Sequence, residues 1–229
     1  CALAGYNGAG KTTLIKLLLR FYDPTKGSIL VNGTDIRKYR LKDYRALFST
    51  AFQDGKIFAR SIRDNVWMGR PQDGCTDAAI WKALELAGIA DTVQKLPKGL
   101  DTILTKEFTG EGVVFSGGQC QKIIAARAFA RSLSPGSQNA PIQIFDEPSS
   151  ALDPIAEHDL MESIKQAGHD KMLLLISHRL SSIQDVENII LLKNGRIAEQ
   201  GRHADLMALN AEYASLYRMQ AQKYHQTSF

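Results

Sequence analysis

The chain has few cysteines, no long apolar run and no block of like charge, and each absence excludes a class of protein. Its three cysteines, Cys1, Cys75 and Cys120, form no CxxC pair and no Cys/His cluster. So sparse a set is typical of a reducing compartment and argues against a disulfide framework or a zinc site. The longest apolar run, Met172–Ser177, has the length of a strand and not the ~20 residues of a membrane helix. We therefore expect this part of the protein to lie in the cytosol.

The charge is mildly basic and dispersed. Lys and Arg outnumber Asp and Glu by 28 to 24, which gives a net charge of +4. No run of five like charges occurs, and no aromatic residues are interleaved with basic ones, as they would be in a nucleic-acid groove. We therefore expect an ordinary solvated surface and no nucleic-acid partner. With 229 residues, of which 44% are hydrophobic, the chain is long enough for a substantial core.

Apolar periodicity predicts an α/β protein. Short apolar runs predict strands at 1–4, 142–145, 172–177 and 188–192, and helical spacing predicts helices at 11–22, 77–93, 117–132, 155–168 and 203–220. Asn32-Gly33 and Asn194-Gly195 predict hairpin turns. Strands that alternate with helices predict a mostly parallel sheet with helices on its faces.

The middle of the chain interrupts this alternation with helical segments, which predicts an inserted subdomain. We expect a catalytic core in two parts, residues 1–59 and 135–229, the second of which carries the C-terminal helix. Residues 60–134 would form the helical subdomain between them.

The segment Gly5–Thr12 fits the pattern G-x-x-x-x-G-K-[ST], between an expected strand and an expected helix. Its glycines let backbone N–H groups wrap phosphates, and the helix N-terminus adds a favourable dipole. Lys11 would neutralise the β- and γ-phosphates, and the Thr12 hydroxyl would ligate Mg²⁺. A glycine-rich turn without a ligand is the alternative, but Lys-Thr at this position favours a nucleoside triphosphate. The expected binding residues are Asn7, Gly8, Ala9, Gly10, Lys11, Thr12 and Thr13.

A pair of carboxylates follows a second expected strand, in "IQIFDEPSSALD". Asp146 would lie at the carboxyl edge of the sheet, where open α/β sheets bind ligands, and could hold Mg²⁺. Glu147 could point at the γ-phosphate and polarise a water for attack. The alternative is an exposed Asp-Glu pair before a proline turn. A buried strand in a chain that already has a phosphate loop favours the functional reading.

A second anion site is expected at Ser116, Gly117 and Gly118, which stand at the head of a predicted helix. One triphosphate does not ordinarily sit at two helix heads. This combination of motifs resembles the nucleotide-binding domain of ATP-binding cassette (ABC) transporters, whose signature helix begins L-S-G-G-Q. The resemblance covers nearly the whole chain and implies a P-loop NTPase fold with an inserted helical subdomain.

The resemblance also implies roles that the residues alone do not show. It places Gln53 in the glutamine loop, which contacts Mg²⁺, and Asp153 in the D-loop. It also implies that His178 is the switch histidine, which contacts the γ-phosphate. It implies a head-to-tail pair in which each ATP lies between one P-loop and the partner's signature. The site then comprises catalytic Lys11, Gln53, Glu147 and His178, the Mg²⁺ contacts Thr12, Gln53 and Asp146, and, on the partner's ATP, Ser116, Gly117, Gly118, Gln119 and Asp153.

The spelling "RSIRDNVWMG" and the C-terminal segment resemble those of exporters. The resemblance therefore implies a Mg-dependent ATPase that drives transmembrane transport at the cytoplasmic face of a membrane. Its partners would be a second nucleotide-binding domain, identical or different, and the coupling helices of a transmembrane domain. Glu107 or Glu111 would contact a coupling helix. Cargo is chosen by membrane helices, so the sequence does not name it.

Three further expectations come from departures and absences. Cys120 stands where the family usually has a polar or charged residue, in a first helical turn whose dipole can favour thiolate, and the alternative is an inert packed thiol. Family members place a base-stacking aromatic residue upstream of the P-loop, so we expect a C-terminal fragment of a longer polypeptide that discriminates weakly between ATP and GTP.

Two alternatives remain, a regulatory half of an asymmetric transporter and a DNA-associated ATPase. Glu147, Ser116 and His178 are all present, which disfavours the first. The second would carry a long coiled coil between Lys11 and Ser116.

Overall fold

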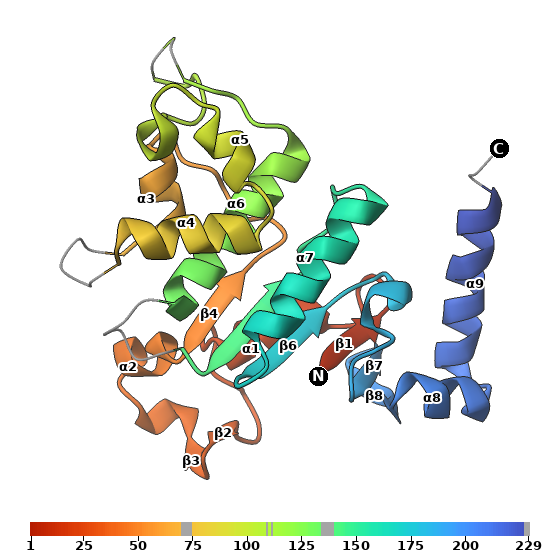
Figure 1. Ribbon diagram of the computed structural model, residues 1–229. Coiled ribbons are helices and arrows are strands. Elements are labelled where there is room, and N and C mark those ends of the chain that lie inside the picture. The colour runs from red at the N-terminus through yellow and green to blue at the C-terminus, as the bar shows by residue number, and fades with distance from the viewer. Residues whose placement is uncertain (70–74, 109, 111, 134–139, 227–229) are drawn as a thin grey trace. The chain divides into compact units, whose positions relative to one another are not determined.

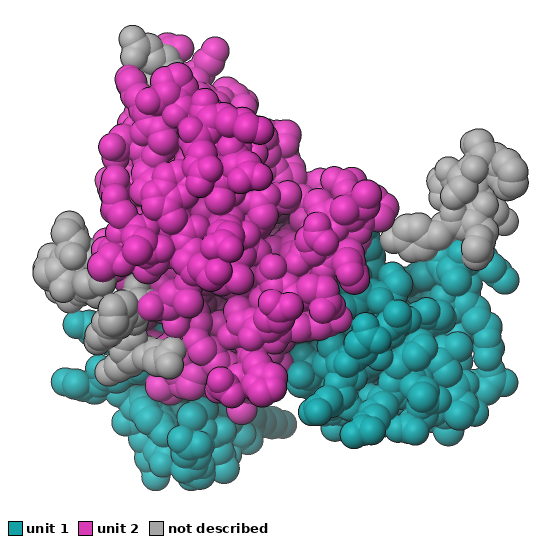
Figure 2. All heavy atoms as spheres, in the orientation of Figure 1, with its two compact units in different colours: residues 1–45, 174–229 teal, residues 46–173 magenta. Residues whose placement is uncertain are grey.

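The computed structural model describes residues 1–69, 75–108, 110, 112–133 and 140–226 (Figure 1). The chain divides into two compact units, which Figure 2 colours separately. Unit 1 comprises Cys1–Arg45 and Leu174–Phe229, and unit 2 comprises Ala46–Leu173. The expected helical subdomain, residues 60–134, falls within the sequence of unit 2.

Unit 1 is built on the first strand, β1 (Ala2–Gly5), whose residues are all buried. It pairs in parallel with β6 (Met172–Ile176) on one side and with β7 (Ile189–Lys193) on the other. The boundary between the units falls within β6. Because β1 has neighbours on both sides, its small residues Ala2 and Ala4 are fully buried, as a central parallel strand requires.

Two hairpins of unit 1 form where Asn-Gly predicted them. In the first, β2 (Leu30–Val31) pairs antiparallel with β3 (Thr34–Asp35) across Asn32-Gly33. In the second, β7 pairs antiparallel with β8 (Arg196–Gly201) across Asn194-Gly195. All four turn residues have positive φ, 49° and 76° in the first turn and 50° and 72° in the second. Asn and Gly adopt this conformation readily, which is why the two dipeptides located both turns.

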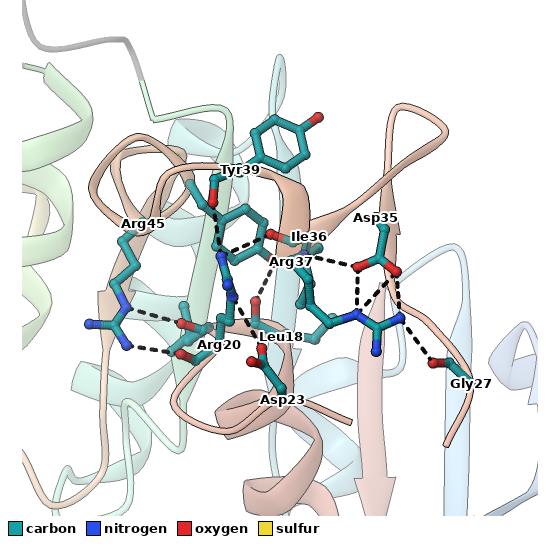
Figure 3. Close-up of polar contacts among 11 residues, drawn as sticks. Leu18, Arg20, Asp23, Gly27, Asp35, Ile36, Arg37, Tyr39 and Arg45 are labelled. Carbon is teal, nitrogen blue, oxygen red and sulfur yellow. Dashed lines mark hydrogen bonds and ion pairs between the residues drawn. The ribbon is translucent and has the colours of Figure 1, made fainter. Parts of the chain in front are cut away.

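The first helix, α1 (Lys11–Leu18), ends earlier than the expected Tyr22 because Arg20 has a φ of 53°. Arg20 holds the turn that follows: its guanidinium donates to the carbonyls of Ile36 and Tyr39 at 3.0 and 2.9 Å and pairs with Asp23 (Figure 3). Arg45 donates in turn to the carbonyl of Arg20 at 2.9 Å. Long-range contacts therefore end a helix that the apolar pattern would have continued.

The remaining helices of unit 1 lie in both of its sequence segments. The first segment contains η1 (Ile36–Lys38) and α2 (Leu41–Ala46). The second segment contains η4 (Leu180–Ile183), α8 (His203–Leu209) and α9 (Glu212–Gln226). The single helix expected at 203–220 is wrong, since Asn210 has a φ of 51° and ends α8. Buried Tyr213 near the start of α9 and Leu206 of α8 face the core of the unit.

Unit 2 contains a parallel pair of strands, β4 (Phe48–Ala51) and β5 (Ile142–Asp146), and a long helix, α6 (Gly117–Leu133). The rings of Phe129 in α6 and Phe145 in β5 lie 5.6 Å apart in the core. α6 also packs against α3 (Ile62–Val66) and α4 (Asp77–Leu86). The other helices of the unit are α5 (Ala90–Gln94), η3 (Gly99–Asp101) and α7 (Pro154–Ala167).

One expected helix of unit 2, at 77–93, is two helices. Gly88 has a φ of 66° and separates α4 from α5. The expected strands at 142–145 and 172–177 and the helices at 117–132 and 155–168 are present, with small shifts at their ends. The prediction of an α/β protein with mostly parallel strands and flanking helices is therefore confirmed.

A buried amide fixes the entry to α3. Asn65 is fully buried, and its Nδ2 donates to the backbone carbonyls of Phe58, Arg60 and Ser61. Its Oδ1 accepts from the N–H of Phe58 at 2.9 Å and from Arg127 of α6 at 3.2 Å. Because every hydrogen-bonding group of the amide has a partner, this loop is bound to α6 without an unsatisfied polar group.

Candidate functional site

The glycine-rich loop lies between β1 and α1 in unit 1, as expected. Gly5 has a φ of 146°, and a Cβ there would collide with the backbone oxygen of Leu192, so only glycine fits. Gly8 and Gly10 also have positive φ, 79° and 105°. The loop is closed by a hydrogen bond of 3.1 Å from the Ala9 N–H to the Tyr6 carbonyl. α1 thus begins after a positive-φ glycine turn of the kind that forms anion-binding concavities.

Lys11, the first residue of α1, points back into this loop. Its side chain is buried, with the residue 8% exposed, and its Nζ donates to the carbonyls of Gly5 and Tyr6 at 2.7 and 3.2 Å. Gly10, which precedes the helix, provides no side-chain cap. A buried ammonium next to an uncapped helix N-terminus suits a phosphate group, because charge and helix dipole both favour an anion there. The loop therefore fits a triphosphate, with Asn7 and Gly8 on its exposed surface and Thr12 and Thr13 exposed on the first turn of α1.

His178 lies at the same edge of unit 1 as this loop. Leu3 of β1 and Ile176 of β6 are in register in a parallel pair, and the N–H of Ser177 donates to the Leu3 carbonyl at 3.4 Å. The chain therefore leaves β6 toward His178 at the edge where it leaves β1 toward the glycine loop. Strand register brings Lys11 and His178 to one edge.

A residue that the sequence reasoning missed fixes the backbone around His178. Gln220 of α9 donates to the His178 carbonyl at 2.6 Å and accepts from the Leu180 N–H at 2.9 Å. Ser177 bonds the backbone N–H and carbonyl of Arg179, at 2.9 and 3.1 Å. No sequence signal points to Gln220, which is one of several glutamines on a polar helix.

The carboxylates lie in unit 2, with Gln53. The parallel pair β4–β5 has Ala51 opposite Phe145, and Gln53 and Glu147 each come two residues later. The strands therefore deliver Gln53, Asp146 and Glu147 to one edge. Asp146 ends β5 and is 8% exposed, whereas Gln53 is exposed. Glu147 has a φ of 48°, a conformation uncommon for a non-glycine residue and concentrated at functional sites.

The head of α6 is closed by a reciprocal cap. The Ser116 N–H donates to Gln119 Oε1 at 2.9 Å, and the Gln119 N–H donates to Ser116 Oγ at 3.3 Å. This is a capping box with glutamine in the third position. Ser116 and Gly117 are exposed, and the hydroxyl proton of Ser116 is not used by the cap.

Asp153 is brought next to this helix head. It caps α7 by accepting from the N–H groups of Ile155 and Ala156 at 3.1 and 3.0 Å, and the Ala156 hydrogen bond chiefly lowers the pKa of its carboxyl. A cavity of about 560 Å³ within unit 2 is lined by Ser116, Gly117, Gly118, Gln119, Lys122 and Asp153, among others. The five residues expected to act on a partner's nucleotide thus surround one hollow, with a lysine beside them.

The expected site residues are divided between the two units. Unit 1 holds the loop residues 7–13 and His178, and unit 2 holds Gln53, Asp146, Glu147 and the residues of the hollow. Within the described ranges, no group of three or more His, Cys, Asp or Glu side chains is placed to hold a metal ion. In the same part of the chain, no helix is both long and apolar enough to cross a membrane.

Two expectations around the signature have different outcomes. Glu107 is exposed, and Glu111 lies outside the described residues. For Cys120, burial raises the pKa of the thiol, and its Sγ lies 3.8 Å from the Phe115 carbonyl, which favours the packed thiol over the thiolate. Desolvation disfavours the charged form of the thiol, and the burial that causes it could not be read from the sequence.

Comparison with known proteins agrees with this geometry. The family model of the ABC transporter matches residues 1–150. An ATP-dependent lipid A-core flippase of Burkholderia orbicola is 40% identical over 97% of this chain, and an ATM1-type heavy metal exporter of Novosphingobium aromaticivorans is 38% identical over 96%. The chain spans 35% and 34% of these proteins.

Among solved structures, a bacterial Atm1-family ABC exporter with ATP bound matches 96% of this chain with a TM-score of 0.85 and 37% identity. This chain covers 36% of that one. The match confirms the expected P-loop NTPase fold of the ABC type. The glycine loop, the carboxylates and the signature helix occur in the order that this family requires, and the chain therefore belongs to the ABC transporter family.

Proposed function

We propose that this chain is the ATP-binding and ATP-hydrolysing motor part of an ABC exporter, which works as a head-to-tail pair. The observation that carries the proposal is the hollow at the head of α6. Its lining includes Ser116, Gly118 and Asp153, all residues of unit 2. The ABC family resemblance assigns these residues to a partner's nucleotide, and an exposed helix N-terminus in a hollow suits a phosphate that is brought by a second copy or a related domain.

In this proposal the residues of one chain bind and position ATP. Lys11 neutralises the β- and γ-phosphates, and the N–H groups at the head of α1 surround them. Thr12, Gln53 and Asp146 are the oxygen ligands suited to Mg²⁺. Bound Mg-ATP supplies the γ-phosphoryl group and the cation that balances its charge.

The remaining residues act on the reaction itself. Glu147 is the general base that accepts a proton from the attacking water, and His178 contacts the γ-phosphate. Ser116, Gly117, Gly118, Gln119 and Asp153 of the partner close the other side. The partner's helix dipole and hydroxyl then add favourable charge where the phosphoryl group departs.

The relatives support the exporter assignment, since both a lipid A-core flippase and a heavy metal exporter match nearly the whole chain. We infer a position at the cytoplasmic face of a membrane, with the coupling helices of a transmembrane domain as partners and Glu107 or Glu111 in contact with one. The division into a core of residues 1–59 and 135–229 and a helical subdomain of residues 60–134 belongs to the same proposal. Because the names of these two relatives refer to different cargoes, they do not indicate which cargo is transported here.

Two variants test the proposal. Glu147→Gln removes the base but keeps the size and polarity of the side chain, so turnover should fall by about 10²–10⁴-fold while ATP still binds. ATP should then hold two copies together as a stable pair. Adding Ser116→Arg should abolish that pair, because a bulky cation fills the hollow, and ATP should still bind at Lys11.

The measurements are turnover, nucleotide binding and ATP-dependent mass in solution. Substantial turnover in Glu147→Gln would show that the base is misassigned. Loss of turnover without any ATP-dependent pairing would overturn the head-to-tail arrangement.

A further inference from the structure

The side-chain amide of Gln121 joins the signature helix to the segment that follows the carboxylates. Gln121 lies in α6, one turn beyond Gly117, and is partly buried. Its Nε2 donates to Ser150 Oγ, and its Oε1 accepts from the Ala151 N–H at 2.8 Å. Both ends of the amide are therefore used, and both partners lie between Glu147 and Asp153.

The backbones also meet at this point. A Cβ added to Gly118 would lie 3.0 Å from the Ala151 carbonyl oxygen, and one added to Gly117 would lie 3.8 Å from the Ala151 Cβ. Gly118 thus lets the first turn of α6 approach residue 151 closely, whereas the contact at Gly117 is an ordinary one. Gln121 makes the polar contact at the same junction.

The segment from Glu147 to Asp153 is itself tightly held. The Ser150 N–H donates to the Glu147 carbonyl at 3.4 Å, and the Leu152 N–H donates to the Ser149 carbonyl at 3.0 Å. Ser149 Oγ, which is buried, bonds Glu157 of α7 at 3.0 Å. A displacement of Ser150 or Ala151 would therefore be felt at both Glu147 and Asp153, because Ser150 is bonded to the Glu147 carbonyl and these hydrogen bonds span the segment between the two carboxylates.

We propose that Gln121 is a positioning residue that makes the head of α6 and the 147–153 segment respond together. When a partner's phosphate binds at Ser116–Gly118, the Gln121 amide passes the constraint to Ser150 and Ala151 and so sets the orientation of Glu147 toward its own nucleotide. Gln121 touches neither phosphate and acts only through these two contacts. The inference rests on the proposed head-to-tail function and adds to it a residue that couples the two nucleotides.

The test uses three variants of Gln121 and its partner. Gln121→Leu keeps the approximate size but leaves the Ala151 N–H and the Ser150 hydroxyl without their partner. Gln121→Glu can accept from both, because the Ser150 hydroxyl can donate instead of accept. Ser150→Ala removes a single contact in a turn and guards against a folding defect in the helix variant. Gln166→Leu, an exposed glutamine of α7 in the same unit, is the matched control.

We expect Gln121→Leu to lower kcat about tenfold, equivalent to about 1.4 kcal/mol, with ATP affinity changed less than about twofold. Gln121→Glu should restore kcat to within about threefold, and Gln166→Leu should leave it unchanged. The double variant Gln121→Leu/Ser150→Ala should be no worse than Gln121→Leu alone, since residues that share one contact are not additive. All variants should keep a wild-type melting temperature within a few degrees.

The inference is overturned if Gln121→Leu keeps kcat, or if Gln121→Glu is as slow as Gln121→Leu. It is also overturned if kcat falls only in step with the melting temperature. Ser116→Arg, measured in parallel, separates this outcome from failure of the proposed function. If Ser116→Arg abolishes ATP-dependent pairing while Gln121→Leu keeps kcat, only the role of Gln121 is lost. If Ser116→Arg also leaves pairing and turnover intact, the head-to-tail function itself is wrong.

Discussion

Gln220 of α9 donates to the carbonyl of His178 at 2.6 Å, so a residue 42 positions later in the chain holds the backbone at His178. We expect Gln220→Leu to reduce ATP turnover about three- to tenfold, because two hydrogen bonds that hold residues 178–180 are lost. ATP binding through Lys11 should be unchanged. Steady-state kinetics and nucleotide titration check both values, and Gln222→Leu, an exposed glutamine on the same helix, is the control. Unchanged turnover in Gln220→Leu would show that His178 is held by other contacts.

Gly5→Ala should destabilise the protein by about 2–4 kcal/mol, because the added Cβ meets the Leu192 oxygen and the residue has a φ of 146°. Gly27→Ala, at a φ of 77° with nothing within 4 Å of the added carbon, should cost only about 1 kcal/mol. Chemical denaturation of both variants gives the difference. Equal losses in the free energy of unfolding would mean that β1 and β7 can move apart to accommodate the added Cβ without an energetic cost.

Asn65→Ala should lower the free energy of unfolding by about 2–4 kcal/mol, since it leaves three backbone carbonyls and the Arg127 guanidinium without the amide. Asn65→Asp should lose a similar amount, because a carboxylate cannot donate to the carbonyls of Phe58, Arg60 and Ser61. Thermal and urea unfolding measure the loss. If Asn65→Asp leaves the free energy of unfolding unchanged, the stabilising contact is the one with Arg127 and not those with the three carbonyls.

Cys120 should react slowly with iodoacetamide at neutral pH. Burial raises the pKa of its thiol above the ordinary value of 9.0, so the neutral form predominates and the rate should keep rising about tenfold per pH unit up to that range. Mass spectrometry of labelled peptides, compared with a short cysteine peptide, checks the rate at each pH. A plateau below pH 8 would indicate a thiolate and restore the influence of the helix dipole.

The sequence predicted the parts of the fold and site that depend on local chemistry. Asn-Gly turns, the glycine loop and the strand before Asp146 each follow from residues within a few positions of one another. The helix ends at Leu18 and Leu209 could not be predicted, because they depend on positive φ at Arg20 and Asn210, residues that also occur inside helices. The contacts of Gln121 and Gln220 join residues 29 to 42 positions apart, and a lone glutamine carries no signal of its partner.

The capping box of Ser116 and Gln119 bears on the kinetics of pairing. Since the first turn of α6 is closed on itself by two hydrogen bonds, this surface is ordered before any nucleotide reaches it. A partner carrying ATP would therefore meet a first turn whose backbone is already in place, and little conformational entropy of that turn would be lost on contact. The association rate should then be set by encounter and orientation, and differences in how long two copies stay together should arise in dissociation.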